Sequence, residues 1–214
     1  PLAYLAKERG LPNVSLLVSQ FLVPPILRAI CADPETAPDA FLAAGHVCAI
    51  MGSDPYVSLA RELRRPIAIT GFEPADILLG VRDVLRLFES GRAEMVNSYP
   101  RIVHPQGNPE AQRILDAVFQ ISDREWRGLG VVPMSGLALR PAFADHDAAV
   151  RFPAPRRPVA GAAPHCPADR VLLGKLQPPD CPHFGTRCTP DHPLGAPMVS
   201  PEGPCAAFYL HRRA

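Results

Sequence analysis

The sequence lacks the features that mark several common classes of protein. Its 22 basic and 21 acidic residues leave a net charge of +1, so no strong field attracts nucleic acid or an anionic membrane. No apolar run approaches the roughly 18 residues that span a bilayer, and the first residues do not have the pattern of a secretory signal. These absences predict a soluble, cytoplasmic protein with neither a nucleic-acid nor a membrane partner.

The opening segment also lacks a residue that would cap a helix. Residues 2–10 (LAYLAKERG) are typical of the last turns of a helix that ends at Gly10, with Lys7 and Arg9 near its C-terminus. Pro1 stands where an initiator methionine is expected. We therefore expect that the sequence begins inside a domain.

What the sequence does contain is a chain of 214 residues, 47% of them hydrophobic, enough for one good core or two small ones. Strand-like and helix-like stretches alternate through the first half, which is typical of a parallel sheet with helices on both faces. The predicted strands are residues 13–19, 39–44 and 66–70, and the predicted helices are residues 24–32, 53–63, 74–90 and 109–119. The fold class is therefore α/β.

The last third of the chain has a different composition. From residue 151 onward proline is far above its usual share of about 5%, and helical periodicity is short and broken. Residues 153–164 (PAPRRPVAGAAP) resemble a linker. We predict three parts, namely the remainder of a first α/β unit at residues 1–37, an α/β domain at 38–122 and a loop-rich C-terminal region at 123–214.

Two of the predicted strands end in glycine-bearing turns, GHV at residues 45–47 and GFEP at 71–74. Ligands in open α/β sheets bind beyond the carboxyl ends of the strands, so these turns are candidate sites. His46 lies in the first turn, although a single histidine there is often only a surface residue. The second turn could bind a polar group at a helix N-terminus, or its glycine and proline could serve only to form the turn.

The six cysteines are informative because cysteines in a reducing compartment seldom form structural disulfides. Cys31 and Cys48 lie in apolar contexts, and core packing is the expected role of Cys31, which ends an apolar helix. Cys48 could form a metal pair with His46 two residues before it, but no further ligand lies near in sequence. The other four share the last quarter of the chain with the spacing C-x14-C-x6-C-x16-C: Cys166, Cys181, Cys188 and Cys205.

Four thiolates on a loop-rich frame suit either a tetrahedral zinc ion or a cubane iron–sulfur cluster. Either metal centre would stabilise a segment that buries little apolar surface of its own. The sequence has neither the C-x2-C knuckle of many zinc sites nor the compact cysteine run of a ferredoxin. Spacing alone leaves the choice open, together with the interpretation that these are unrelated core or free thiols.

A longer pattern surrounds these cysteines. Residues 180–209 (DCPHFGTRCTPDHPLGAPMVSPEGPCAAFY) resemble the C-terminal signature of the HypD family of hydrogenase formation proteins. The resemblance continues upstream, in the family's order, through GHV, GFEPADIL (71–78), NSYPR (97–101), GNPEA (107–111) and EWRGLG (125–130). It implies that the four cysteines ligate a [4Fe–4S] cluster.

The resemblance also implies a function in metallocofactor assembly rather than conventional catalysis. The family is a scaffold on which an Fe(CN)2CO unit forms with HypC and the cyanide-donating HypE and HypF, before transfer to the large subunit of a [NiFe] hydrogenase. By position, His46 is expected to face the assembly site and Glu202, in the EG-x-C motif, to lie near the cluster.

One part of the family pattern is missing from this sequence. The family's iron-binding and redox cysteines belong to CGTH and GPGCPVC motifs, and neither these nor the GFETTAPTTA loop occurs here. We therefore expect that this chain alone cannot mature a hydrogenase. Two other classes remain as alternatives: a ferredoxin–thioredoxin-reductase-like protein, which would need Cys31 and Cys48 as its thiol pair, and a zinc-stabilised interaction module.

Overall fold

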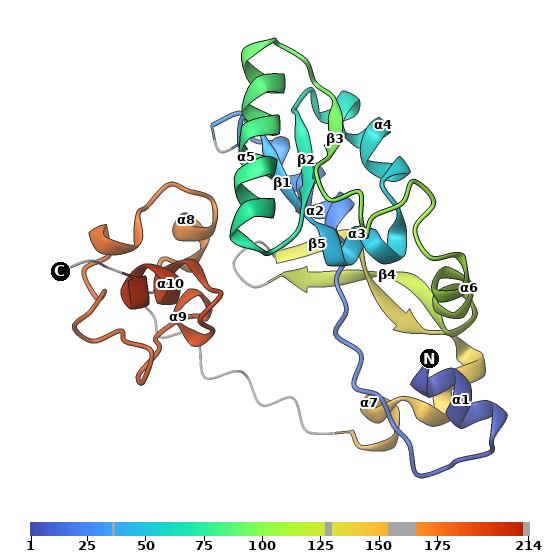
Figure 1. Ribbon diagram of the computed structural model, residues 1–214. Coiled ribbons are helices and arrows are strands. Elements are labelled where there is room, and N and C mark those ends of the chain that lie inside the picture. The colour runs from blue at the N-terminus through green and yellow to red at the C-terminus, as the bar shows by residue number, and fades with distance from the viewer. Residues whose placement is uncertain (36, 127–129, 154–165, 212–214) are drawn as a thin grey trace. The chain divides into compact units, whose positions relative to one another are not determined.

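The computed structural model describes residues 1–35, 37–126, 130–153 and 166–211 (Figure 1). Contacts divide the chain into two compact units. Unit 1 consists of Pro1–Ser122 and Met134–Phe152, and unit 2 of Asp123–Pro133 and Pro153–Ala214. The three-part division expected from composition stays a prediction. The predicted linker lies, apart from Pro153, outside the described residues.

Unit 1 contains the parallel sheet that the α/β pattern predicts. Strands β1 (Phe41–Ala44), β2 (Ile67–Thr70) and β3 (Met95–Asn97) lie in the order β1-β2-β3, and both pairs are parallel. All four residues of β2 are buried, which is typical of a central strand with both faces covered. Sequence analysis missed β3, which is only three residues long and has no alternating pattern.

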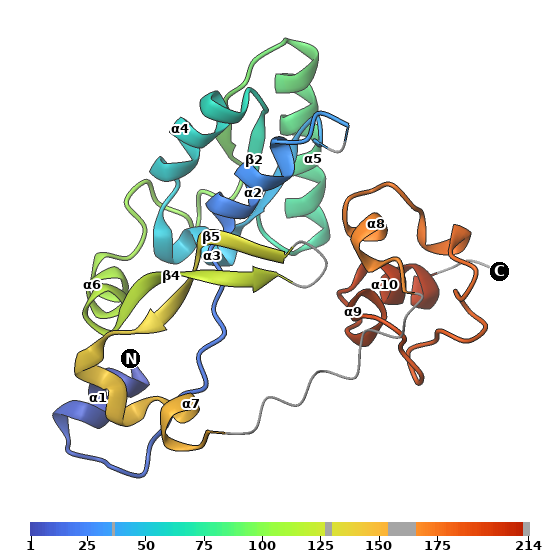
Figure 2. The same ribbon diagram turned by 180° about the vertical axis from the view of Figure 1, so that it is seen from behind.

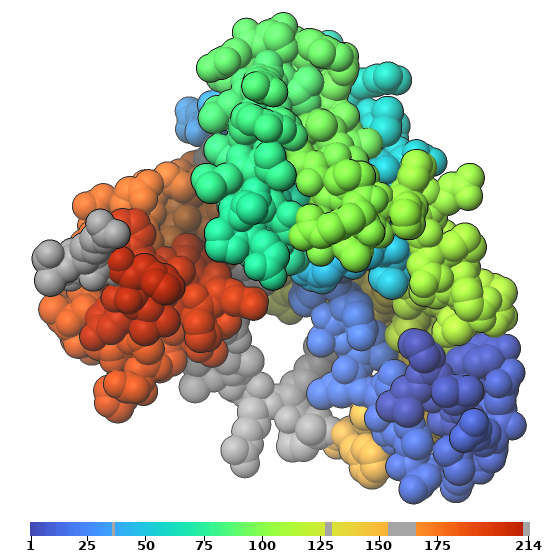
Figure 3. Space-filling view, viewed as in Figure 1, coloured from blue at the N-terminus to red at the C-terminus, as the bar shows by residue number. Residues whose placement is uncertain are grey.

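Helices cover both faces of this sheet (Figures 1 and 2). On one face, α2 (Val23–Cys31) packs on α4 (Asp54–Leu63), which follows α3 (Gly45–Met51). On the other face, α5 (Pro74–Glu89) contacts β2 and β1. The outer side of α5 lies at the surface of unit 1, as Figure 3 shows.

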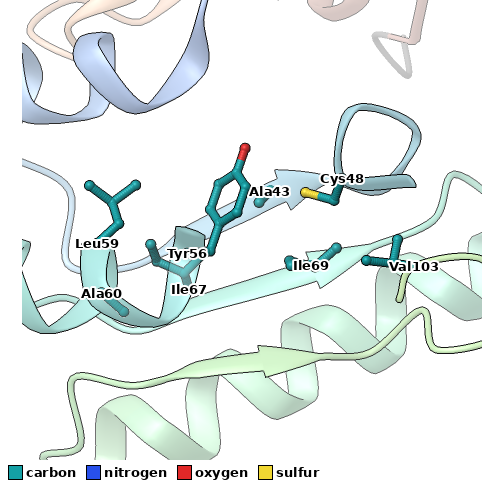
Figure 4. Close-up of a cluster of buried hydrophobic side chains, with 8 residues drawn as sticks. All are labelled: Ala43, Cys48, Tyr56, Leu59, Ala60, Ile67, Ile69 and Val103. Atoms are coloured by element: carbon teal, nitrogen blue, oxygen red, sulfur yellow. The ribbon is translucent and has the colours of Figure 1, made fainter. Parts of the chain in front are cut away.

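The core of unit 1 lies between α4 and the sheet (Figure 4). Alternate residues of β2 point to opposite faces, so Ile67 and Ile69 enter this core while Thr70 faces Gly80 of α5. The buried members of the cluster are Ala43, Cys48, Tyr56, Leu59, Ala60, Ile67, Ile69 and Val103. Cys48 is fully buried in this core, with an exposed fraction of 0%.

A second, smaller core completes unit 1. Its buried residues are Ala3 of α1 (Leu2–Glu8), Val118 at the end of α6 (Pro109–Val118), Leu139 and Phe143. Strands β4 (Phe119–Trp126) and β5 (Gly130–Leu139) form a two-stranded sheet, of which Asp123–Pro133 belongs to unit 2. The 3-10 helix η1 (Pro141–His146) and helix α7 (Ala148–Arg151) follow in unit 1. The helix expected at residues 109–119 is present, but the sheet after it was not foreseen.

The strand predicted at residues 13–19 is wrong. Only single bridges form in this part of the chain, between Leu16 and Asp147 and between Phe21 and Gly136. The Leu16 N–H donates to the carbonyl of His146, and the Leu16 carbonyl accepts from Ala148. The partner of Leu16 is a helical turn rather than a strand, so no ladder propagates along residues 13–19.

Unit 2 is rich in loops, as its composition predicts. Its elements after residue 165 are the short helices α8 (Ala168–Leu172), α9 (Ala196–Val199) and α10 (Pro204–His211) and the 3-10 turn η2 (Pro178–Asp180). Cys188, Met198 and Ala206 form its small buried core. In the part of the chain that the structure describes, no helix is long and apolar enough to cross a membrane.

Candidate functional site

The four cysteines that are far apart in sequence come together in unit 2. All of them line one small cavity of about 20 Å³. The other side chains around it are apolar, among them Val171, Phe184 and Met198. The four cysteines therefore share one nonpolar cavity.

Each cysteine is placed by a turn or by the end of a short helix. Cys166 lies two residues before α8, Cys181 directly follows η2, and Cys205 is the second residue of α10. Cys188 closes a compact turn in which its N–H donates to the carbonyl of His183 (2.8 Å). Proline and glycine beside these cysteines favour such turns over a continuous helix.

The wall of the cavity leaves no spare room beside Cys166. A methyl group on Gly195 would overlap the Cys166 sulfur, so glycine allows the backbone of this loop to approach the thiol closely. The N–H of Leu194 donates to the sulfur of Cys188 (3.4 Å), and an N–H hydrogen bond of this kind stabilises a thiolate. The loop at residues 194–195 therefore contacts two of the four sulfurs.

The thiols also influence each other's ionisation. Burial, followed by the charges of Cys188, Cys166 and Cys181, raises the pKa of Cys205 to about 11. Burial and the charges of Cys188 and Cys181 raise the pKa of Cys166 as well. Without a metal, thiolates at this site would be desolvated and would repel one another, whereas bound metal cations would neutralise them.

The donor set fits a sulfur-ligated metal centre, because its four soft ligands are the type that iron–sulfur clusters and zinc require. Across the described residues, no group of three or more His, Cys, Asp or Glu side chains is placed as metal ligands. The four cysteines thus share a cavity without standing in the positions of metal ligands.

His46 lies at the carboxyl edge of the parallel sheet in unit 1. It is the second residue of α3, which begins directly after β1, so the expectation that it lies in a turn is wrong. Its exposed ring contacts the ring of Phe72, with centroids 4.9 Å apart, and Phe72 lies just beyond the end of β2. The GHV and GFEP segments therefore meet at one edge, as parallel strand ends must.

Sequence analysis missed an ion pair at the same edge. Asp76, in the first turn of α5, is 3% exposed and accepts two hydrogen bonds from Arg101, each 2.6 Å long. Hydrogen bonding and charge from the Arg101 guanidinium lower the pKa of Asp76. An aspartate within the apolar start of a helix (GFEPADIL) was the available signal, since a buried carboxylate needs a partner.

The remaining candidates are scattered. Glu202 is exposed, does not line the cysteine cavity, and lies in the turn before α10. Cys31 is half-buried at the end of α2 rather than part of the core, while burial raises the pKa of Cys48 deep inside unit 1. Neither of these two lines the cavity. His165, next to Cys166 in sequence, lies outside the described residues.

Comparison with known proteins gives a consistent result. The model of the HypD family, described as the hydrogenase formation hypA family, matches residues 2–212. The chain is 41% identical over 215 residues to the hydrogenase expression/formation protein HupD of Azotobacter chroococcum mcd 1. It is 39% identical to the hydrogenase maturation factors HypD of Rhizobium leguminosarum bv. viciae, over 215 residues, and of Escherichia coli K12, over 210 residues. Each match covers 97% of this chain but 56% of the relative, so the chain spans little more than half their length.

Proposed function

Because this chain belongs to the HypD family of hydrogenase formation proteins, we propose that it takes part in the maturation of [NiFe] hydrogenases as the cluster-bearing part of an assembly scaffold. The observation that carries the proposal is the cavity lined by Cys166, Cys181, Cys188 and Cys205. In this proposal the four thiolates hold a [4Fe–4S] cluster. Its partners are a HypC-type chaperone, a HypE-type cyanide donor and, indirectly, the hydrogenase large subunit.

Membership of the HypD family supports a cluster over a zinc ion, because the family resemblance implies that the four matching cysteines ligate a [4Fe–4S] cluster. A zinc ion would need four sulfurs about 2.3 Å from one point, whereas a cluster spreads its cysteine ligands over four irons. The cavity of about 20 Å³ is smaller than a cluster, so the loops that carry the cysteines would have to move apart when a cluster binds.

When bound, the cluster would supply electrons during assembly of the Fe(CN)2CO unit. The protein's own residues would tune and shield it. Leu194 donates its N–H toward one ligand sulfur, and the apolar side chains of Phe184 and Met198 keep water from the ligands. His46 would donate a proton or a hydrogen bond at the assembly site, and Glu202 would act near the cluster.

The cluster assignment is tested on anaerobically purified protein. We expect a broad visible absorption band, with iron and sulfide in equal amounts, because a [4Fe–4S] cluster contains both. A colourless protein that contains zinc would support the interaction module instead. Cluster electrons that reduce a Cys31–Cys48 disulfide would support the thioredoxin-reductase-like alternative.

The assembly role is tested by complementation of a strain that lacks its own scaffold protein. The chain would be compared with the same chain fused to a family N-terminal segment containing the CGTH and GPGCPVC motifs. We expect hydrogenase activity from the fusion only, since an Fe(CN)2CO unit needs an accessible thiolate anchor and Cys48 is fully buried. Activity from the chain alone would place the assembly chemistry within these 214 residues.

His46 and Glu202 are tested in the same fusion. His46→Ala or Glu202→Ala should lower hydrogenase maturation and leave the iron content unchanged, because neither residue lines the cysteine cavity. Loss of iron in either variant would make that residue a ligand or a structural residue of the cluster region.

A further inference from the structure

A network of polar and aromatic contacts ties together the carboxyl ends of all three parallel strands in unit 1. The Asp76 carboxylate is 3% exposed and is bound by both terminal nitrogens of Arg101. The hydroxyl of Thr70, the last residue of β2, donates to the Asp76 carbonyl (2.7 Å). From the end of β3, the Asn97 side chain accepts the N–H of Tyr99 (3.0 Å). One network thus joins β2, β3 and the start of α5.

The ring of Tyr99 extends this network to β1. A methyl group on Gly45 would lie 2.6 Å from the ring, and one on Gly71 would lie 2.7 Å from its other side. The ring therefore contacts the backbone at both strand ends, where any larger residue would be excluded. The guanidinium of Arg101 lies 4.4 Å from the centre of the same ring, within the range of a cation–π interaction.

The residues that follow these two glycines carry the side chains at the carboxyl edge of the sheet. His46 follows Gly45, Phe72 follows Gly71, and their rings contact each other with centroids 4.9 Å apart. Both side chains are exposed, so burial contributes little to the geometry of this contact. The contact is restrained instead by the positions of the backbone at Gly45 and at Gly71, and the Tyr99 ring lies against both segments.

We propose that Arg101 and Tyr99, anchored by the buried carboxylate of Asp76, are positioning residues that hold His46 against Phe72 at the carboxyl edge of the sheet. The Tyr99 ring sets the separation of the strand ends. Asp76 holds the guanidinium through two parallel hydrogen bonds, and the guanidinium covers the ring. The inference rests on the proposed function only for its consequence, namely that a correctly placed His46 serves the assembly site.

The fork geometry of arginine is essential to this arrangement. Lysine keeps the charge but cannot form two parallel hydrogen bonds with a carboxylate or stack a planar group on tyrosine. Arg101→Lys should therefore disturb the position of the ring even though it preserves the charge. The Arg101 side chain is 55% exposed, so this change should not prevent folding.

The test is NMR of the labelled chain, with nuclear Overhauser effects measured between the His46 and Phe72 rings. We expect strong inter-ring effects in the wild-type chain and their loss in Arg101→Lys and Asp76→Asn. The amide resonances of Gly45 and Gly71 should shift in the same variants. Protection of the Ile69 amide from hydrogen exchange shows that each variant is folded, so a lost contact cannot be attributed to unfolding.

The chain offers a closely matched control. Arg113 also binds a carboxylate with two nitrogens, that of Glu110, and lies over a tyrosine ring, that of Tyr4. It lies on α6, outside the network at the strand ends. Arg113→Lys should leave the contact between His46 and Phe72 unchanged.

Two outcomes would overturn the proposal: an unchanged inter-ring contact in folded Arg101→Lys, or its equal loss in Arg113→Lys. If Asp76→Asn does not fold, Arg101→Lys and Tyr99→Leu decide the question. Both variants keep a positively charged side chain beside the buried Asp76 carboxylate.

A second readout separates this inference from the proposed function. In the complementing fusion, Arg101→Lys should lower hydrogenase activity while the visible band of the cluster keeps its intensity. If His46→Ala proves fully active and the NMR contact is still lost in Arg101→Lys, the positioning role stands and the assembly role of His46 fails.

Discussion

At the scale of single residues, the cysteines of unit 2 differ from those of unit 1 by what surrounds them. Cys188 lies in the core of unit 2, where its sulfur accepts a backbone hydrogen bond and lines the cavity shared with three other thiols. Cys48 is more deeply buried, but its surroundings are the aliphatic and aromatic core of unit 1. Burial alone therefore does not mark a candidate ligand, whereas a cavity shared by four thiols does.

This difference predicts contrasting effects of the same substitution. Cys188→Ser should lower bound iron sharply and destabilise unit 2, because the thiolate is both a proposed ligand and a constraint on the fold. Cys48→Ser should leave bound iron unchanged, although it places a hydroxyl in an apolar core. Iron and sulfide analysis of the two proteins checks the prediction. Full iron retention in Cys188→Ser would contradict the four-ligand assignment.

Gly195 offers a test that leaves all six cysteines in place. Gly195→Ala should lower iron content, since the added methyl group would displace the sulfur of Cys166. The control is Gly174→Ala, at φ +72° with open space around it, where the cost is backbone strain of about 1–2 kcal/mol without a clash. Iron analysis and thermal unfolding of both proteins separate the two effects. Equal iron content in the two proteins would show that the loop at residues 194–195 moves to accommodate the added methyl group.

The raised pKa of Cys205 predicts how stability depends on pH in the metal-free chain. Between its ordinary pKa of 9.0 and the folded-state pKa of about 11, the folded protein holds a proton that the unfolded chain has lost. Raising the pH through this window therefore favours unfolding. The melting temperature of the wild-type chain should fall as the pH rises through this window, and that of Cys205→Ala should fall less. Identical pH profiles would argue against a buried, mutually repelling thiol cluster.

At the scale of secondary-structure elements, the central strand β2 carries the stability of unit 1. Ile69→Ala should lower the free energy of unfolding by about 2–5 kcal/mol, because it leaves a cavity beneath α4. Leu42 on the neighbouring strand is 45% exposed, so Leu42→Ala should cost less. Urea unfolding followed by far-UV circular dichroism measures both. A comparable loss in the two variants would mean that the core is not centred on β2.

Elements with strong local signals were predictable, and those that depend on distant partners were not. The apolar, β-branched stretch at β2 and the long amphipathic pattern of α5 indicated their structures because their own residues form the buried face. Residues 13–19 have a similar apolar content, yet their backbone partner is the turn near Asp147. The identity of that partner is encoded more than a hundred residues away.

At the scale of the whole molecule, the two units have separate hydrophobic cores that share no residue. In the described part of unit 2 the hydrophobic cluster has three buried members, Cys188, Met198 and Ala206, so the order of this unit should depend on bound metal, whereas unit 1 has two such clusters. Removal of iron with a chelator should speed hydrogen exchange at residues 166–211 and leave the amides of β2 protected. Hydrogen-exchange mass spectrometry checks this, and uniform protection before and after chelation would contradict it.

The α/β class, the family and the identity of the four cysteines followed from local patterns, because hydrophobic periodicity and motif spacing are properties of the chain itself. Tertiary structure decided that these four cysteines line one cavity, since residues 39 positions apart meet there only after the turns between Cys166 and Cys205 have folded. It also decided that His46 begins a helix, and that Asp76 finds Arg101. An ion pair between residues 25 positions apart depends on which strand ends lie side by side, and only the packed sheet determines that.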